Sequence, residues 1–184
     1  TGDSSVLEWY EQEREKERMC AALQEPQDTA VQHSKGDMLY SYQRVGANFI
    51  ANVGRTIVAD EPGLGKTAET IVAVEMTEHS NVLVVCPNSL KMHWRAEHSR
   101  WTQFPNEPVT VVDAKNRHNL GTCRGWYIIH YELFRVAPWF QQWNWDWLIL
   151  DEAQNAKNRD TETFRLLKEL NVKRMALLTG TPFG

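Results

Sequence analysis

Short apolar runs alternate along the chain with longer segments in which apolar residues recur at helical spacing. The apolar runs predict strands at residues 55–60, 81–87, 108–113, 126–130, 146–150 and 173–180. The segments of helical period predict helices at residues 41–53, 66–79, 89–101 and 161–170, the first of them capped by Ser41. Because nearly continuous apolar strands alternate with helices, they predict an α/β fold with a mostly parallel, doubly wound sheet and helices on both faces.

The first 37 residues differ from the rest in both pattern and charge. Residues 6–23 predict an exposed helix supported by charge pairs three residues apart, and residues 24–37 predict a linker. Residues 1–28 hold eight acidic and three basic residues, so they more than account for the net charge of −4. We therefore expect a charged N-terminal helix and linker at 1–37 and one nearly neutral α/β domain at 38–184.

The cysteines and the hydropathy of the chain exclude several classes of protein. Cys20, Cys86 and Cys123 lie far apart, form no C-x-x-C pair and show no ligand spacing with the histidines, which indicates neither a disulfide framework nor a zinc site. No apolar run approaches the ~20 residues of a membrane span, and no signal peptide is visible. This pattern fits a reducing, intracellular compartment. A first residue other than Met and an end just after "LLTGTPFG" favour a piece of a longer protein.

The stretch "VADEPGLGKTAET" lies between the first predicted strand and the helix that follows it. Gly65, Lys66 and Thr67 form the second half of a Walker A pattern, although Asp60 stands where that pattern begins with Gly. Gly63 and Gly65 allow backbone N–H groups to curl around phosphate oxygens at the start of the helix. The Lys66 ammonium can reach the outer phosphates, and the Thr67 hydroxyl can ligate Mg²⁺. The alternative is a structural turn that carries a surface lysine.

Two carboxylates, Asp151 and Glu152, follow the predicted strand at 146–150. Ligands of open α/β sheets bind beyond the carboxyl ends of the strands, where the glycine-containing loop also lies. Asp151 would hold Mg²⁺, and Glu152 would polarise the water that attacks the γ-phosphate. Acids at the start of a helix are also favoured by the helix dipole alone. The conjunction with the phosphate loop favours the catalytic interpretation.

The motifs "DEPGLGKT", "DEAQNAKN" and "LLTGTP" together resemble the first RecA-like lobe of superfamily-two helicases and translocases, and among these the Swi/Snf-type DNA translocases. Members of this family also begin the Walker A loop with Asp-Glu rather than Gly. The resemblance covers residues 38–184 and implies a RecA-like P-loop NTPase lobe that uses ATP and Mg²⁺. It implies catalytic roles for Lys66 and Glu152 and metal binding by Thr67 and Asp151. The implied nucleotide-binding residues are Gln43, Asp60, Glu61, Pro62, Gly63, Leu64, Gly65, Lys66, Thr67, Ala68 and Asp151.

The same resemblance implies contacts to DNA and a link between the sites. The implied DNA contacts are Pro87, Asn88, Ser89, Lys91, His130, Tyr131, Lys157 and Asn158. The implied coupling residues are Gln154, Thr179, Gly180 and Thr181. Relatives commonly carry His at the position of Gln154, and we expect Gln to hydrogen-bond across to the "TGTP" turn in its place.

Taken together, the motifs predict the ATP-binding lobe of a DNA-dependent ATPase that couples ATP hydrolysis to movement on duplex DNA. The family's arginine finger belongs to a second RecA-like lobe of the full-length chain, so the 184 residues alone should hydrolyse little ATP. The alternatives are a strand-separating helicase, the motor subunit of a restriction system, or a nucleotide-gated nucleic-acid-binding module without turnover. Compact motif spacing favours a bacterial or phage enzyme in the cytoplasm, whereas a eukaryotic one would be nuclear.

Four tryptophans crowd the approach to the strand at 146–150, namely Trp139, Trp143, Trp145 and Trp147. Large aromatic side chains dominate the packing of cores, and they can also stack on nucleic-acid bases. We expect packing to be their role, with a base-stacking platform as the alternative.

Overall fold

The computed structural model describes residues 30–118, 120, 124–156 and 162–180, and the helix predicted at 6–23 lies outside these residues. Six strands form one sheet in the order β1-β6-β5-β2-β4-β3, and all neighbouring pairs run parallel. The strands are β1 (Arg55–Val58), β2 (Asn81–Cys86), β3 (Val109–Val111), β4 (Gly125–His130), β5 (Asn144–Asp151) and β6 (Asn171–Leu178). The predicted parallel α/β sheet is confirmed.

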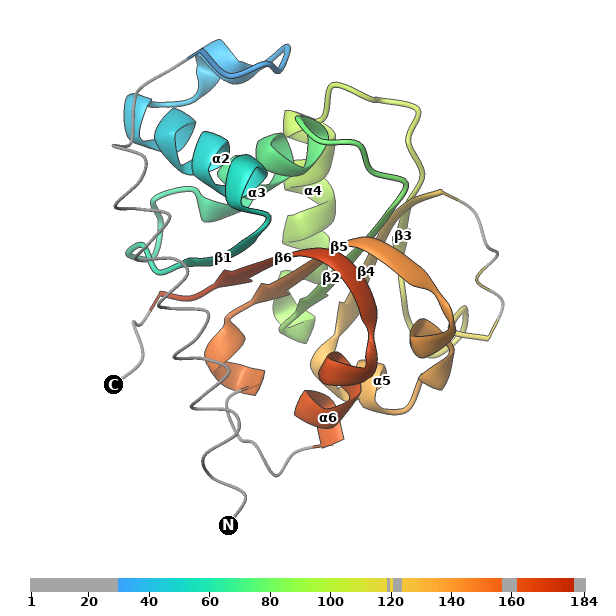
Figure 1. The fold of residues 1–184 in the computed structure, drawn as a ribbon. Coiled ribbons are helices and arrows are strands. Elements are labelled where there is room, and N and C mark those ends of the chain that lie inside the picture. The colour runs from blue at the N-terminus through green and yellow to red at the C-terminus, as the bar shows by residue number, and fades with distance from the viewer. Residues whose placement is uncertain (1–29, 119, 121–123, 157–161, 181–184) are drawn as a thin grey trace.

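Helices cover both faces of the sheet, as Figure 1 shows. One face carries α2 (Ser41–Val53), α3 (Lys66–Glu75) and α4 (Lys91–Trp101), and the other carries α5 (Tyr131–Arg135) and α6 (Glu162–Glu169). The chain moves across the sheet in one direction through α3 and α4 and returns through α5 and α6. Because crossovers between parallel strands are right-handed, the reversal of direction places the two sets of helices on opposite faces.

Alternate residues of the central strands divide the core into two layers. In β2, Val82 and Val84 pack with Ile71 of α3, whereas Leu83 and Val85 pack in the layer under α5 and α6. All of these side chains are fully buried. Burial of one such side chain is worth roughly 1.5–3 kcal/mol, so apolarity on both faces of the strand fixes β2 at the centre of the sheet.

Several predicted boundaries are wrong in instructive ways. The helix predicted at 66–79 ends at Glu75, because the Thr77 hydroxyl and N–H both bond the Val74 carbonyl and close the last turn. Ser41 is the first helical residue rather than the cap, and Gln43 accepts a hydrogen bond from the Tyr40 N–H instead. The short helix α5 was not predicted. Four 3-10 turns complete the described elements, at Gly36–Met38, Asn88–Leu90, Pro138–Gln142 and Ala153–Ala156.

Part of the predicted linker packs on the core. The His33 ring lies 3.1 Å from the Glu75 carboxylate, and Val31 packs against the cluster that contains α2 and α3. Residues 30–37 therefore contact the α/β domain, and a domain boundary at residue 38 stays a prediction. Among the described residues, no helix combines the length and the apolar character that crossing a membrane requires.

The tryptophans of β5 are packing residues, as predicted. Trp145 and Trp147 are fully buried. Their indole N–H groups donate hydrogen bonds of 2.9 Å to the Phe140 carbonyl and the Thr77 hydroxyl, respectively. Buried rings with satisfied N–H groups cannot stack on bases, so the alternative role is excluded for these two residues.

Candidate nucleotide site

The glycine-containing loop joins β1 to α3 and is exposed from Asp60 to Leu64. Gly63 and Gly65 have φ angles of 87° and 84°, in the left-handed region that favours glycine. A Cβ on Gly65 would lie 2.3 Å from the side-chain nitrogen of Gln43, so a larger residue would also clash. The loop therefore has the backbone conformation and the bare surface that a phosphate-binding turn requires.

Lys66 opens α3 and folds back over the loop. Its Nζ donates hydrogen bonds of 2.6 Å to the Asp60 carbonyl and 2.9 Å to the Glu61 carbonyl. Thr67 follows in the first turn of α3, where the N–H groups of the helix point toward the loop. The ammonium group thus spans the mouth of the loop at the positive end of a helix, where anions are favoured.

Two side chains of α2 hold the loop from the other side. The Gln43 amide donates to the Leu64 carbonyl at 3.0 Å, and the Tyr42 hydroxyl donates to the same carbonyl at 3.2 Å. Gln43 is buried, so the residue expected at the adenine edge fixes the loop in this structure. Tyr40 and Tyr42 were missed by the sequence reasoning. Their rings stack at 5.8 Å and are exposed by 69% and 47%.

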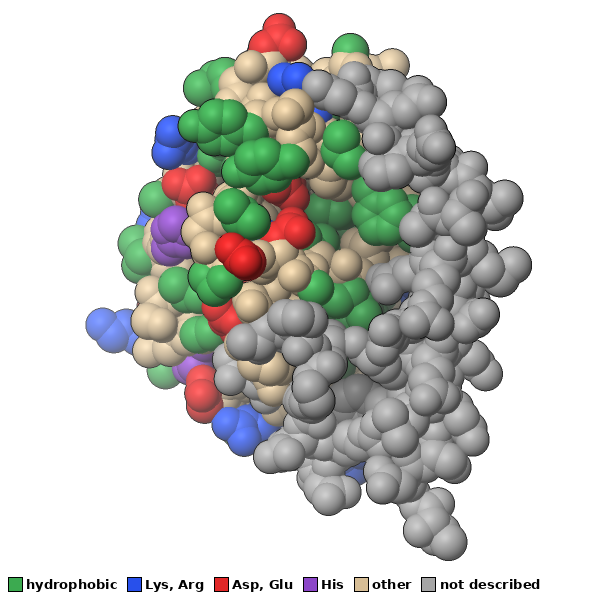
Figure 2. All heavy atoms as spheres, turned by 90° about the vertical axis from the view of Figure 1, so that its left-hand side faces the viewer, with side chains coloured by type: hydrophobic (Ala, Val, Ile, Leu, Met, Phe, Trp, Pro, Cys, Tyr) green, Lys and Arg blue, Asp and Glu red, His purple; other side chains and the backbone are tan. Residues whose placement is uncertain are grey.

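The face that carries α2 and the loop is shown in Figure 2. Hydrophobic side chains gather there next to acidic ones. Exposed side chains of both kinds lie in the loop or beside it: the apolar ones are Tyr40, Tyr42 and Leu64, and the acids are Asp60 and Glu61. An aromatic and apolar surface beside a phosphate loop is suited to a base attached to the phosphates.

The acidic pair lies at the carboxyl end of β5, as the strand pattern predicts. The Asp151 carboxylate is buried and accepts hydrogen bonds of 2.7 Å from the Trp94 indole and 3.0 Å from the Glu152 N–H. Burial raises the pKa of Asp151, against the opposing effects of the Trp94 hydrogen bond and the Lys66 charge. Because burial disfavours the charged carboxylate, a cation bound beside it would restore the charge.

Glu152 has an unusual backbone conformation. Its φ of 51° is positive, which a non-glycine residue rarely adopts and which costs roughly 1–2 kcal/mol. The conformation turns the chain sharply after β5, and the Glu152 carboxylate accepts a hydrogen bond from the Gln154 amide. Strain of this kind is concentrated at functional sites, where the surrounding structure maintains it.

The end of β6 lies between the loop and the acidic pair. The Thr179 N–H donates to the Val58 carbonyl of β1 at 3.0 Å, and the Thr179 hydroxyl donates to the Gln154 side chain at 2.9 Å. A Cβ on Gly180 would lie 2.9 Å from the Pro62 ring, so this turn touches the loop. The hydrogen bond expected from Gln154 to the "TGTP" turn is present. Thr181 lies outside the described residues.

A buried acid in α3 was also missed by the sequence reasoning. Glu69 is 1% exposed, and within the described structure neither of its carboxylate oxygens has a hydrogen-bond partner. Gly46 of α2 makes room for it, because a Cβ there would lie 2.5 Å from Glu69 Oε2. Burial, reinforced by the Asp60 charge and opposed by Lys66, raises the pKa of Glu69 to about 8. The side chain is therefore mainly protonated at neutral pH.

Comparison with known proteins identifies the family of the chain that carries this site. The model of the SNF2-related domain family matches residues 6–184. The chain belongs to the SNF2-related family. The match confirms the resemblance read from the motifs, and it begins earlier than the expected start at residue 38.

Individual relatives of this SNF2-related lobe are much longer proteins. Helicase SWR1 of Saccharomyces cerevisiae is 32% identical over 162 residues, which cover 78% of this chain and 11% of that protein. Helicase domino of Drosophila melanogaster is 31% identical over 162 residues, which cover 78% of this chain and 5% of that protein. Both of these relatives are eukaryotic, so they give no support to a bacterial or phage source.

A solved structure shows the same fold. The Sulfolobus solfataricus SWI2/SNF2 ATPase core in complex with dsDNA superposes with a TM-score of 0.72 at 29% sequence identity. The similarity covers 87% of the SNF2-related lobe and 34% of that chain. It confirms the predicted RecA-like α/β fold, since the parallel sheet and its helices match those of an ATPase core.

The residues of the SNF2-related lobe that we expect to contact DNA fall into three groups: those in the turns after β2 and β4, the buried Tyr131, and two that lie outside the described residues. The first group lies at the carboxyl ends of two strands. Cys86 and His130 are register partners at the ends of β2 and β4, so the turns that follow them are neighbours. Asn88 and Ser89 are exposed in the first turn, and the nearby Lys91 charge adds to burial in lowering the pKa of His130. These side chains, together with half-buried Pro87, lie together at one edge of the sheet.

The remaining candidates do not join this group. Tyr131 is buried, and its hydroxyl donates a hydrogen bond of 2.8 Å to the Asp151 carbonyl. The expectation that Tyr131 contacts DNA is therefore corrected: it supports the backbone of the acidic pair. Lys157 and Asn158 lie outside the described residues.

Proposed function

We propose that this lobe binds Mg-ATP and belongs to a DNA-dependent ATPase that moves along duplex DNA. The observation that carries the proposal is the position of Thr179, which bonds the end of β1 through its N–H and Gln154 through its hydroxyl. Thr179 thereby links the phosphate loop, on one side of the end of β6, to the acidic pair on the other side. A structural turn with a surface lysine would not need this second bond to an acidic motif.

Each residue of the site has a role that its contacts support. When the nucleotide binds, Lys66 gives up its hydrogen bonds to the carbonyls of Asp60 and Glu61 and offsets the charge of the outer phosphates. Thr67 and Asp151 would hold Mg²⁺, whose charge offsets that of the phosphate oxygens during transfer. Asp151 fits this role because burial disfavours its charge without a cation. The Tyr40–Tyr42 surface lies where the base of the nucleotide would rest.

Glu152 acts on the attacking water in this proposal. Its strained backbone fixes the direction of the side chain at the carboxyl end of β5, and Gln154 holds the carboxylate by a hydrogen bond. A carboxylate in this place accepts hydrogen bonds from water and makes the oxygen a better nucleophile. The Gln154–Thr179 bond then couples the state of Glu152 to the turn after β6.

DNA would contact the turn after β2 and the residues that follow β4. Asn88 and Ser89 offer exposed polar groups, and Lys91 offers a charge, which together suit phosphates rather than bases. The solved SWI2/SNF2 ATPase core is a complex with dsDNA, which supports duplex DNA as the partner. A second RecA-like lobe of the full-length protein would supply the arginine finger, and the protein would act in the compartment that holds the DNA.

Phosphate release by the full-length protein, measured over many turnovers with and without duplex DNA, tests the proposal. We expect ATP hydrolysis that duplex DNA stimulates, together with displacement of a third strand from a DNA triplex. ATP binding without turnover, whether or not DNA is present, would refute the catalytic proposal and favour a nucleotide-gated binding module. Unwinding of a blunt duplex would favour a strand-separating helicase.

A further inference from the structure

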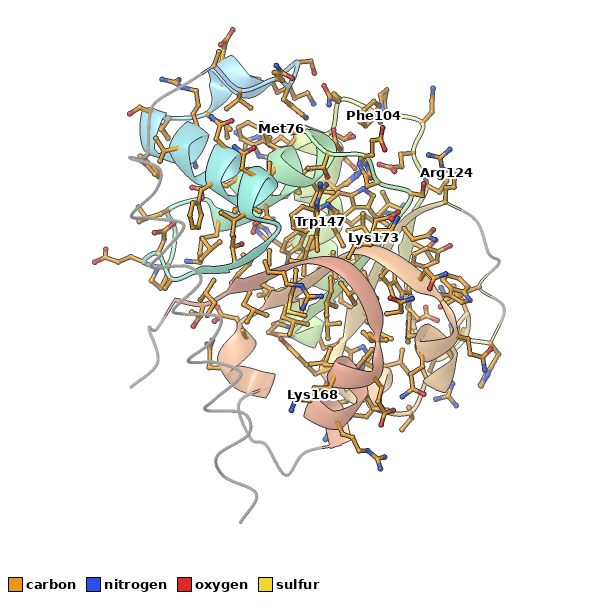
Figure 3. All side chains as sticks on the ribbon, viewed as in Figure 1. Met76, Phe104, Arg124, Trp147, Lys168 and Lys173 are labelled. Carbon is orange, nitrogen blue, oxygen red and sulfur yellow. The ribbon has the colours of Figure 1, made fainter. Side chains whose placement is uncertain are left out.

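A buried group of histidines and glutamates lies at the end of α3 opposite the phosphate loop. Glu75 is the last residue of α3, His98 lies in α4, and Glu107 precedes β3. His33 comes from the segment before α2, and His79 follows α3. Met76 and Phe104, labelled in Figure 3, mark this region: Met76 follows Glu75, and the Phe104 ring lies 6.0 Å from that of His79. Four separate segments thus meet here.

Three side chains turn toward one another at the centre of the group. The ligand atoms of Glu75, His98 and Glu107 all lie within 4.8 Å of one another. His98 Nε2 lies 3.8 Å from Glu75 Oε1 and 3.9 Å from Glu107 Oε2, too far for hydrogen bonds. The side chains are 3%, 0% and 13% exposed in the order His98, Glu75, Glu107. Water therefore has little access to the centre.

Two of the central atoms lack a hydrogen-bond partner within the described structure. They are His98 Nε2 and Glu75 Oε1, both buried and both directed at the centre. A buried polar atom without a partner costs roughly 1–3 kcal/mol, so two of them facing each other need a compensating interaction. A cation between them would supply it.

Groups around the centre hold both carboxylates in place. Glu75 Oε2 accepts a hydrogen bond of 2.8 Å from the Gln103 N–H and lies 3.1 Å from the His33 ring nitrogen. Both oxygens of Glu107 have partners: Oε2, which faces His98, accepts a hydrogen bond of 2.9 Å from the Trp126 indole, and Oε1 lies 3.3 Å from His79 Nε2. Outer partners of this kind orient the ligands of metal sites and are part of their construction.

We propose that Glu75, His98 and Glu107 bind one divalent transition-metal ion, and that Zn²⁺ is the ion whose ligand preference they match. Bonds of about 2.0–2.2 Å in a tetrahedral site separate the ligand atoms by roughly 3.3 Å, so small side-chain rotations close the observed spacing. Imidazole nitrogen selects zinc over Mg²⁺, which prefers a shell of oxygen atoms. The ion joins α3, α4 and the chain before β3.

The site is independent of the proposed ATPase activity. The ten residues of α3 separate the cluster from Lys66 by roughly 15 Å along the helix axis. The readout of the test is therefore metal binding and stability rather than turnover. If no metal binds, the proposed nucleotide site is not called into question. If the full-length protein does not hydrolyse ATP, the proposed metal site is not called into question either.

Calorimetric titration and thermal unfolding of the chelator-treated full-length protein test the proposal with Zn²⁺ as the probe. We expect one Zn²⁺ to bind at this site and to raise Tm, whereas Mg²⁺ without nucleotide does not. His98→Gln should weaken this binding by more than the ~10–100-fold typical of losing an outer partner. His93→Gln is the matched control, because His93 is exposed on the same helix and should bind Zn²⁺ as the wild type does.

A second variant keeps the test decisive if His98→Gln does not fold. Glu107→Gln retains the size of a half-buried side chain and should lose Zn²⁺ binding while its Tm without metal stays measurable. Co²⁺ supplies an independent signal, since a bound ion with nitrogen and oxygen ligands gains a visible spectrum that these variants lack. Equal Zn²⁺ affinity in the wild type, His98→Gln and Glu107→Gln would overturn the proposal, as would a wild-type Tm that Zn²⁺ leaves unchanged.

Discussion

The Thr179 hydroxyl donates a hydrogen bond of 2.9 Å to the side-chain carbonyl of Gln154, and the Gln154 amide donates in turn to Glu152. An amide suits this position because it has a donor and an acceptor on opposite branches of one planar group. Gln154 therefore forms a continuous path of hydrogen bonds from the end of β6 to the acidic pair. The path predicts that Gln154 and Thr179 act as a unit.

We expect Gln154→Ala and Thr179→Val to reduce DNA-stimulated ATP hydrolysis by the full-length protein by similar factors. The double variant should be little worse than either single one, because both remove the same bond, with an interaction energy of roughly 0.5–3 kcal/mol. Steady-state phosphate release with saturating duplex DNA measures the effect. Gln141→Ala serves as control, since Gln141 bonds the exposed Glu169 away from the site. Additive losses would show that the two side chains act separately.

Glu152→Gln should reduce kcat by ~10²-fold or more, about 2.7 kcal/mol, because the amide cannot polarise water as the carboxylate does. The variant keeps an oxygen that can accept the bond from Gln154, so ATP affinity should change little. Lys66→Ala should instead weaken ATP binding itself, because the partner of the phosphate charge is lost. Nucleotide titration and single-turnover hydrolysis separate the two effects. Hydrolysis by Glu152→Gln at near the wild-type rate would disprove its catalytic role.

The pH dependence of stability should reveal Glu69. Its pKa is about 8 in the folded chain against an ordinary 4.5, so the protonated form stabilises the fold. This contribution is complete below pH 4.5 and is lost as the pH rises through about 8. The Gln side chain of Glu69→Gln cannot ionise. The free energy of unfolding of this variant should therefore exceed that of the wild type, and the difference should grow with pH to roughly a few kcal/mol.

Urea unfolding across this pH window checks the prediction, with Glu132→Gln as the control at an exposed position. The control should follow the wild-type pH profile. Parallel profiles for wild type and Glu69→Gln would show that the buried carboxyl carries no net penalty and is solvated or paired in solution.

Binding to duplex DNA should depend on salt through Lys91. Each phosphate contact made by a lysine contributes about one unit to the slope of log affinity against log salt concentration. Lys91→Ala in the full-length protein should lower the slope by about one and weaken binding to all sequences alike. Lys168→Ala, exposed in α6 on the other face of the sheet, should leave the slope unchanged. A sequence-specific loss, or equal slopes for both variants, would contradict the proposed DNA surface.

The sequence predicted those parts of the site that are contiguous in the chain. The phosphate loop and the acidic pair each occupy consecutive residues after an apolar strand, and strand ends meet at one edge of a parallel sheet. The bond from Trp94 to Asp151 joins residues 57 positions apart, and no local pattern distinguishes Trp94 from other packing tryptophans. The central ligands at 75, 98 and 107 come from three segments, so their spacing resembles no metal motif.

Burial was the other property that the sequence did not reveal. Glu69 follows the phosphate loop in an amphipathic segment, where an acid ordinarily faces solvent. It is buried because Gly46 on α2 leaves a space that the carboxyl group fills. Tyr131 was misassigned for the same reason, since a polar side chain after a strand can point inward when another strand end offers a carbonyl to its hydroxyl, as Asp151 of β5 does here.

The contact between Gly180 and Pro62 restricts the directions in which the phosphate loop can move. With 2.9 Å between a Cβ position on Gly180 and the Pro62 ring, a swing of the loop toward β6 meets backbone at once. On the α2 side the loop is held by two side-chain hydrogen bonds to the Leu64 carbonyl, which rotation of Tyr42 and Gln43 can release. The loop of the proposed nucleotide site therefore has room to move on the α2 side, where rotation of two side chains frees it, and not on the side of β6.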